Sequence, residues 1–208
     1  MIRIEIQDIG KKFNTEWIFR HVNYTFEDHL AYAILGRNGS GKSTLLQVIA
    51  GNLYPTTGKV KYILSGKEVA PEKIFQHLTI VAPYLELIED FTLREMLDFH
   101  FSFKSIIPGH SIPKIIELLG FSKIGKNPIR LFSSGMKQRV KLVLAVLSDV
   151  PLLLLDEPTM NLDQAGVDWY LNILEKFAGN RTIIVCSNIQ QQETSFCSGK
   201  LLIEDYKQ

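Results

Sequence analysis

A glycine-rich segment at residues 36–44, Gly-Arg-Asn-Gly-Ser-Gly-Lys-Ser-Thr, has the residue types and spacing of a loop that binds phosphate. Gly36, Gly39 and Gly41 allow backbone conformations that a side chain would forbid, so that successive N–H groups can point inward around an anion. A chance glycine-rich turn is the alternative, but we expect this spacing by accident in under about one chain of this length in a hundred. The segment therefore predicts a site for the phosphates of a nucleotide.

Polar side chains of the same segment supply groups that bind phosphate and Mg²⁺. We expect Lys42 to reach the β- and γ-phosphates as a point charge, and the Ser43 hydroxyl to be a ligand of Mg²⁺. The residues predicted to contact the nucleotide here are Gly36, Asn38, Gly39, Ser40, Gly41, Lys42, Ser43 and Thr44.

Two adjacent carboxylates, Asp156 and Glu157, follow the apolar run 152–155. Sheets of α/β proteins hold their ligands at the carboxyl ends of strands. Asp156 suits the shell of a Mg²⁺ ion, and Glu157, which points to the opposite side, can polarise a water for in-line attack on the γ-phosphate. A solvated strand end that carries acids is the alternative, and the phosphate loop disfavours it. The sequence therefore predicts a site of nucleotide hydrolysis, with Lys42 and Glu157 as catalytic residues.

The segment 131–140, Leu-Phe-Ser-Ser-Gly-Met-Lys-Gln-Arg-Val, resembles the signature motif of ABC (ATP-binding cassette) ATPases. The order of the motifs is also similar to that family, since Asp156 follows Gly135 by twenty-one positions. The resemblance implies that two ATP molecules lie between two subunits, with the signature of one covering the γ-phosphate bound to the other. Ser133, Ser134 and Gly135 would then form a second anion site at a helix N-terminus, although Ser-Ser-Gly alone is an ordinary helix cap.

The resemblance extends over nearly the whole chain, from about Ile2 to Asp205, and implies further roles. Asp163, in the segment 160–163, would lie in the D-loop and contact the partner subunit. Phe13 falls where the family has an aromatic residue that stacks on adenine, although a lone aromatic residue at a strand end is more often part of a core.

Two sensors of the γ-phosphate differ from the family. Tyr84 replaces the glutamine of the Q-loop, and its hydroxyl can bind a water or Mg²⁺ but offers no amide carbonyl. In the alternative interpretation, Gln76 or Glu86 takes this role through a shifted loop. Asn188 replaces the switch histidine, and it can donate a hydrogen bond to the γ-phosphate but cannot carry a proton there. We therefore expect Asn188 to take part in catalysis and hydrolysis to be slow or partner-dependent.

Alternating strands and helices must position these residues. The fold class that this alternation predicts is α/β, and the resemblance implies a P-loop NTPase core with an N-terminal antiparallel β lobe and an inserted α-helical lobe. Apolar runs predict core strands of a mixed sheet at 31–35, 79–81, 152–155 and 182–185. Helical periodicity predicts helices at 42–50, 93–101, 113–119, 134–147 and 164–177.

The chain length and patterning favour one domain. We interpret residues 1–208 as a single nucleotide-binding domain, with antiparallel strands up to about residue 29 and a helical lobe at about 92–148. The sequence shows no apolar run that would cross a bilayer and begins without a secretory signal, which predicts a cytoplasmic protein. Cys186 and Cys197 stand in no metal-ligand spacing. The net charge of +1, without a basic stripe, argues against a nucleic-acid partner.

The function that the sequence predicts is the ATP-hydrolysing subunit of an ABC transporter. ATP and Mg²⁺ are the implied ligands, and separate membrane-spanning permease subunits and a second nucleotide-binding subunit are the implied partners. The protein would then lie on the inner face of the cell membrane, held there by its membrane partner. A soluble ABC ATPase that acts on DNA or ribosomes, and a P-loop kinase or GTPase, are the alternatives.

Overall fold

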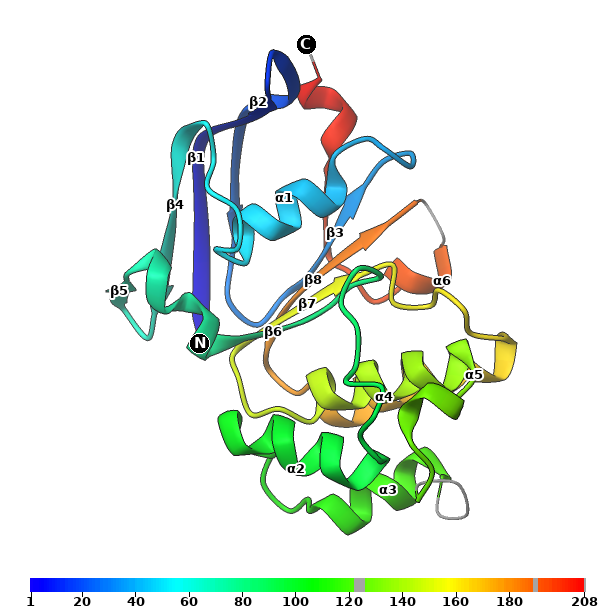
Figure 1. The fold of residues 1–208 in the computed structure, drawn as a ribbon. Helices are drawn as coiled ribbons and strands as arrows, with labels where there is room; N and C mark the ends of the chain where they lie inside the picture. The colour runs from blue at the N-terminus through cyan, green and yellow to red at the C-terminus, as the bar shows by residue number, and fades with distance from the viewer. Residues whose placement is uncertain (122–125, 189–190, 208) are drawn as a thin grey trace. The chain divides into compact units, whose positions relative to one another are not determined.

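The computed structural model describes residues 1–121, 126–188 and 191–207, and its chain is divided into two compact units (Figure 1). The first unit contains Met1–Ile80, Pro151–Glu157 and Asn180–Gln208. The second unit contains Val81–Val150 and Pro158–Gly179. The interpretation of 1–208 as a single domain with a helical lobe at about 92–148 stays a prediction.

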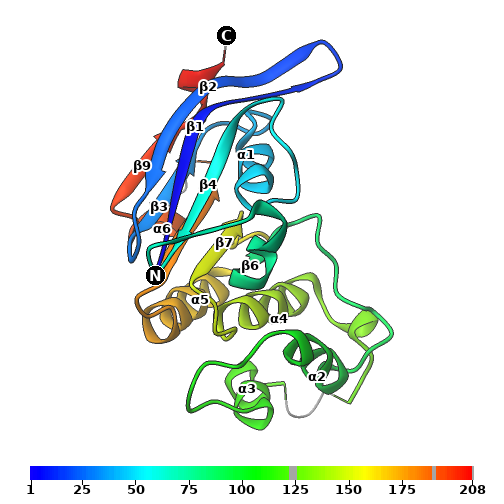
Figure 2. The same ribbon diagram turned by 90° about the vertical axis from the view of Figure 1, so that its left-hand side faces the viewer.

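An antiparallel sheet forms one part of the first unit, as Figure 2 shows. Its strand order is β2-β1-β4-β5, and each neighbouring pair is antiparallel. Apolar residues alternate along β1, so that Ile2, Ile4 and Ile6 are all buried on one face. The strands are β1 (Ile2–Phe13), β2 (Glu16–Phe26), β4 (Thr57–Leu64) and β5 (Lys67–Val69).

A second sheet in the first unit carries the strands that end at the predicted site. Its strand order is β6-β7-β8-β3-β9. The pairings β7–β8, β8–β3 and β3–β9 are parallel, and the N-terminal strands β1 and β2 belong to the other sheet. The strands are β3 (Ala31–Leu35), β6 (Leu78–Val81), β7 (Leu152–Asp156), β8 (Thr182–Ser187) and β9 (Gly199–Leu202).

Helix α1 (Lys42–Ile49) shares a hydrophobic core with both sheets of the first unit (Figures 1 and 2). Leu45, Leu46 and Ile49 on this helix are fully buried, in one cluster with the isoleucines of β1 and the leucines of β7. Short helices complete the unit: 3₁₀ helices at Pro71–His77 and Ile203–Tyr206, and α6 (Gln191–Thr194). The loop between β3 and α1 is therefore held at both ends by buried elements.

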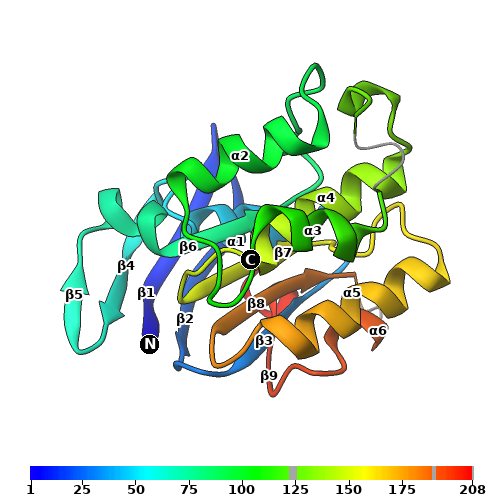
Figure 3. The same cartoon turned by 90° about the horizontal axis from the view of Figure 1, so that it is seen from below.

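The second unit is helical and is seen from below in Figure 3. Side chains cap three of its helices at the N-terminus: Thr92 forms a capping box with Glu95, Ser133 accepts from Met136 N, and Asp163 accepts from Gly166 N. Such caps satisfy backbone N–H groups that have no partner within the helix. The helices are α2 (Leu93–Phe103), α3 (Ile112–Leu119), α4 (Ser134–Val146) and α5 (Gln164–Phe177), with a 3₁₀ turn at Ile129–Leu131.

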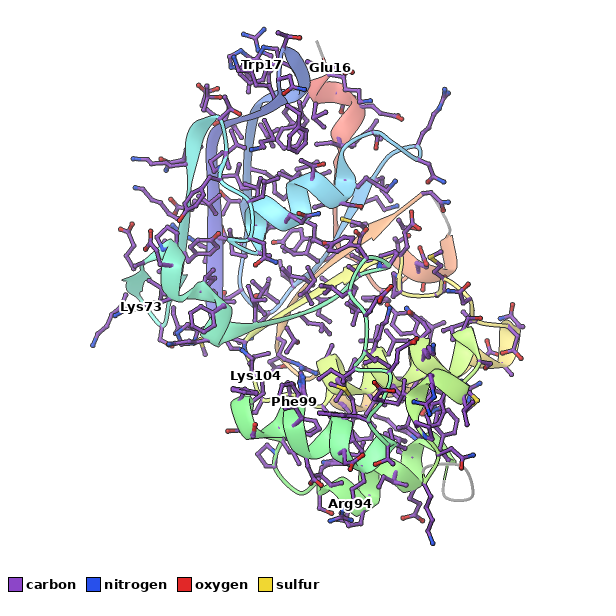
Figure 4. All side chains as sticks on the ribbon, in the orientation of Figure 1. Glu16, Trp17, Lys73, Arg94, Phe99 and Lys104 are labelled. Atoms are coloured by element: carbon purple, nitrogen blue, oxygen red, sulfur yellow. The ribbon has the colours of Figure 1, made fainter. Side chains whose placement is uncertain are left out.

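Helix α2 carries exposed aromatic side chains. The rings of Phe99 and Phe103 meet edge to face with centroids 5.3 Å apart, and Phe103 is 74% exposed. Figure 4 labels Phe99 together with Arg94 and Lys104, which lie on or next to the same helix. In the part of the chain that the structure describes, no helix combines the length and apolar character needed to span a bilayer.

Candidate nucleotide-binding site

The predicted phosphate loop surrounds a cavity in the first unit. The cavity has a volume of about 210 Å³ and is lined by Ile18, the loop residues Asn38 to Thr44, and Glu157. The structure thus brings the glycine-rich segment and one of the two predicted carboxylates together. Ile18 was not predicted, because nothing in its local sequence indicates that β2 lies against the loop.

Two glycines of the loop leave no room for a side chain. Gly41 has φ 104°, and a Cβ atom there would lie 2.6 Å from Ile18 Cγ2. A Cβ atom at Gly36 would lie 2.5 Å from Ser40 Oγ. Both the backbone conformation and the close approach of neighbouring groups therefore require glycine at these positions.

Lys42, the first residue of α1, is buried and directs its ammonium group back into the loop. Its Nζ atom donates hydrogen bonds to the carbonyl oxygens of Gly36, at 2.9 Å, and Arg37, at 3.1 Å. A buried ammonium group is stable only with such partners. Phosphate oxygens are acceptors of the same kind with more negative charge, and the arrangement suits a cation that binds them.

Asp156 ends β7 with a carboxylate that has no hydrogen-bond partner among the described residues. The residue is 1% exposed. Burial raises the pKa of Asp156 above its ordinary value, and the nearby charges of Glu157 and Glu193 act in the same direction. The Ser43 hydroxyl and the Lys42 ammonium group oppose this shift.

These oxygen atoms fit a hard divalent cation. A buried carboxylate without a partner, beside the Ser43 hydroxyl, is an incomplete set of oxygen ligands of the kind that Mg²⁺ takes together with substrate phosphates. Within residues 1–121, 126–188 and 191–207, no group of three or more His, Cys, Asp or Glu side chains could hold a metal ion. The pair of Asp156 and Ser43 fits a metal ion that takes its other ligands from a nucleotide.

Glu157 follows Asp156 in an uncommon backbone conformation. Its φ angle is 46°, in the left-handed region that residues with a side chain rarely adopt. Its N–H donates to the carbonyl oxygen of Cys186 in β8, at 3.0 Å. The strand ladder therefore continues through the main chain of Glu157, while its side chain lines the cavity.

The predicted signature residues line a separate cavity within the second unit. This cavity has a volume of about 370 Å³. Ser133 Oγ accepts a hydrogen bond from Met136 N at 3.2 Å, so the side chain does cap α4 as an ordinary cap residue would. The cavity is lined by the signature residues Ser133, Ser134 and Gly135 together with Phe121, Met136, Arg139, Asn161, Leu162 and Asp163. Of the residues beyond the motif, only Asp163 had been predicted to have a role.

The remaining predicted residues do not line either cavity. Phe13 is 47% exposed at the end of β1, next to Glu16, and the Lys11 ammonium group lies 5.1 Å from its ring centroid. Figure 4 labels Glu16 and Trp17 at this end of the hairpin. Phe13 is thus not a core residue. Asn188 is exposed directly after β8.

The three candidates for the Q-loop role lie in different places. Tyr84 is 46% exposed and belongs, like Glu86, to the second unit, whereas Gln76 lies in the 3₁₀ helix Pro71–His77 of the first unit. The role of Tyr84 as a metal ligand and that of Phe13 as an adenine contact stay predictions.

A buried strand, a glycine-rich loop with an enclosed lysine and an acidic strand end define the chain as a P-loop nucleotide-binding protein. A model of the ABC transporter family matches residues 19–160. The chain belongs to this family, as an ATP-binding subunit that hydrolyses ATP.

Two curated relatives and a solved structure are similar to the chain over most of its length. The ABC transporter ATP-binding protein YybJ of Bacillus subtilis, itself uncharacterised, is 30% identical over 197 residues, which cover 93% of this chain and 89% of YybJ. The lantibiotic transport ATP-binding protein SrtF of Streptococcus pyogenes is 29% identical over 192 residues, which cover 89% of this chain and 80% of SrtF. The ATP-binding cassette MJ0796, solved as a dimer in a post-hydrolysis state with ADP and Pi, has a TM-score of 0.79 at 20% identity, over 97% of this chain and 95% of that one.

Proposed function

We propose that the chain powers an ABC transporter through ATP-driven closure of two nucleotide-binding subunits. The observation that carries this proposal is the cavity at the phosphate loop, where Lys42, Ser43 and Glu157 meet beside the buried carboxylate of Asp156. The name of the relative SrtF, a lantibiotic transport ATP-binding protein, supports a role in transport.

In the proposed mechanism, the loop holds the phosphates and Glu157 directs a water. Backbone N–H groups of the loop and the N-terminus of α1 bind the β- and γ-phosphates, and Lys42 exchanges its two carbonyl partners for phosphate oxygens. The Glu157 carboxylate accepts a proton from a water that attacks the γ-phosphorus in line with the leaving ADP. Asp156 and Ser43 would hold Mg²⁺, which neutralises charge on the phosphate oxygens.

A second subunit completes each site in this proposal. Ser133, Ser134 and Gly135 stand at the N-terminus of α4 and offer two hydroxyl groups and backbone N–H groups to an anion. They would contact the γ-phosphate bound to the partner, so that ATP joins two surfaces and hydrolysis releases them. Closure is then a shift in population that the differential affinity of ATP drives.

The partners that we propose are ATP, a second nucleotide-binding subunit and membrane-spanning permease subunits, with no nucleic acid. The exposed aromatic face of α2 supports a contact with a protein outside this chain. Through such a permease the protein would lie on the cytoplasmic side of the cell membrane.

Steady-state ATP hydrolysis by the purified protein, measured across protein concentration, tests the proposal. Glu157→Gln serves as the blank, because it keeps the shape of the side chain and loses the base. Turnover that rises with the square of concentration would show a homodimer with two complete sites. Turnover that needs a permease or another cassette would show that the partner is different. Turnover by Glu157→Gln equal to that of the wild type would contradict the assignment of the site.

A further inference from the structure

The loop that follows Glu157 is fixed to the signature helix by a buried side chain. Gln138, on the second turn of α4, is 6% exposed, and its Nε2 atom donates a hydrogen bond to the carbonyl oxygen of Pro158 at 2.7 Å. Pro158 is covalently bonded to Glu157. The amide of Gln138 thus holds the peptide group between Pro158 and Thr159, one residue beyond the residue proposed as the general base.

Two further contacts join the same segments. A Cβ atom at Gly135 would lie 2.9 Å from the carbonyl oxygen of Asn161, so α4 and the loop approach as closely as backbone atoms allow. The Arg139 guanidinium lies 5.3 Å from the ring centroid of Trp169 on α5, and 4.0 Å from the carboxylate of Asp163. Residues 133–139 and 158–163 therefore meet at three positions of α4, namely Gly135, Gln138 and Arg139.

These contacts differ in how much they restrain the loop. The ion pair of Arg139 and Asp163 is long and Asp163 is exposed, which makes it weak. The hydrogen bond of Gln138 is short and buried, and its loss would leave the Pro158 carbonyl without that donor in a place that water does not reach. Gln138 therefore restrains the loop after Glu157 more strongly than the pair of Arg139 and Asp163 does.

We propose that Gln138 is a positioning residue for ATP hydrolysis, which couples the signature segment to the backbone that carries Glu157. The inference rests on the proposed function, in which the signature contacts ATP on the partner subunit and Glu157 is the base. When the signature segment is drawn onto that nucleotide, the loop 158–163 follows it, and Pro158 then shifts the carbonyl side of Glu157, whose N–H stays bonded to Cys186 O. Hydrolysis would then respond to closure through one hydrogen bond.

Three variants test the proposal. Gln138→Leu keeps the approximate volume and removes the donor. Gln138→Glu replaces the donor with a carboxylate, which can donate to the Pro158 carbonyl only in its protonated form. Gln164→Leu is the matched control, because Gln164 is exposed at the start of α5 and its Nε2 atom bonds only one turn further, to Asp168.

We expect Gln138→Leu to lower kcat for ATP about tenfold or more, with KM changed by less than about twofold, because a displaced base slows chemistry and leaves nucleotide binding intact. The ratio of kcat for Gln138→Glu to that of the wild type should rise as pH falls, since burial favours the protonated acid that can donate. Unchanged kcat in Gln138→Leu, a change in KM alone, or a ratio that is flat with pH would each overturn the proposal.

Hydrogen exchange gives a readout that needs no turnover. The Leu162 N–H donates to Thr159 O at 3.0 Å within the loop, and the Gly166 N–H donates to Asp163 Oδ1 at 2.8 Å. Both amides should exchange faster in Gln138→Leu and at the wild-type rate in Gln164→Leu, and equal rates in all three proteins would overturn the proposal. Failure of the proposed function looks different, since Glu157→Gln would then retain wild-type turnover.

Discussion

At the scale of single residues, the burial of Asp156 disfavours the charged form of its carboxyl group. Its carboxylate is fully enclosed and its two oxygens have no hydrogen-bond partner among the described residues. Burial therefore raises its pKa, and the charges of Glu157 and Glu193 add to the shift. A residue in such a position weakens the ligand-free fold, and in the proposed function it would hold a cation.

We expect Asp156→Asn to stabilise the ligand-free protein near pH 7 while it abolishes Mg²⁺-dependent turnover. A raised pKa in the folded state means that the charged form costs stability above that pKa, and asparagine removes the charge. The gain should be on the order of 1 kcal/mol, or a few degrees in Tm. Thermal unfolding without nucleotide measures it, and the gain should vanish at low pH, where aspartate is protonated. A lower Tm at pH 7 would contradict this account.

A second prediction concerns Asn188, which is exposed directly after β8. We expect Asn188→His to raise kcat about tenfold. This is less than the rate enhancement that a well-positioned proton-transfer group typically contributes. The gain should depend on pH near the ordinary pKa of histidine, about 6.5. Initial rates from pH 5.5 to 8 measure it, with Asn188→Ala as the control. Equal rates for all three proteins would show that this position takes no part in hydrolysis.

Sequence spacing predicts which residues would bind phosphate, but it does not predict the distant residues that contact these segments. The loop 36–44 and the pair of Asp156 and Glu157 are contiguous motifs, whose chemistry follows from residue type and order. Ile18 and Gln138 act through contacts with segments distant in sequence, at Gly41 and Pro158. Such contacts depend on strand order and helix packing, which no local pattern specifies.

At the scale of elements, the predicted strands and helices agree closely with the structure where periodicity is strong. The predicted helix 164–177 coincides with α5, and the predicted strand 31–35 coincides with β3. Strand β4 was not predicted, although its alternation of Lys59, Val60, Lys61 and Tyr62 is typical of a strand. Strand β9 was not predicted either, because it has only four residues and its pairing with β3 determines its conformation.

Helix α2 contains a partly buried histidine, His100, whose shifted pKa makes the stability of the fold depend on pH. His100 Nε2 lies 2.9 Å from Ser148 Oγ, and that hydroxyl donates to Leu144 O at 2.6 Å. Burial, with a smaller contribution from the Lys104 ammonium group, lowers the pKa of His100 from 6.5 to about 4. The unfolded chain therefore binds this proton first as pH falls.

We expect the wild type to lose about 3 kcal/mol of stability through His100 between pH 7 and pH 4. The loss of stability begins near the pKa of histidine in the unfolded chain, 6.5, and is nearly complete at the pKa of His100 in the folded protein, about 4. Urea unfolding at the two pH values should show a smaller loss in His100→Gln, which keeps a donor for Ser148 and has no proton to gain. His21→Gln, on the exposed side of β2, is the control. An equal loss in the wild type and His100→Gln would refute the prediction.

At the scale of the whole molecule, the two surfaces that ATP is proposed to join belong to different compact units. The phosphate loop belongs to the first unit and the signature residues to the second. The sequence indicated both motifs, but their division between compact units depends on which distant segments pack together.

We expect Glu157→Gln to form a dimer in the presence of ATP and Mg²⁺, because bound γ-phosphates join two subunits and the variant cannot remove them. Size-exclusion chromatography should show a monomer without nucleotide and a dimer with it. Gly135→Asp in the same background is the control, since a carboxylate at the signature repels phosphate. A monomer under all conditions would show that the partner is a different cassette.

The hydrogen bonds of Lys42 affect how a nucleotide would enter the site. The hydrogen bonds of Lys42 to Gly36 O and Arg37 O hold the loop around its ammonium group. The entropy of ordering the loop is thus lost during folding and not during binding. In the proposed function, nucleotide would therefore meet a preorganised receptor.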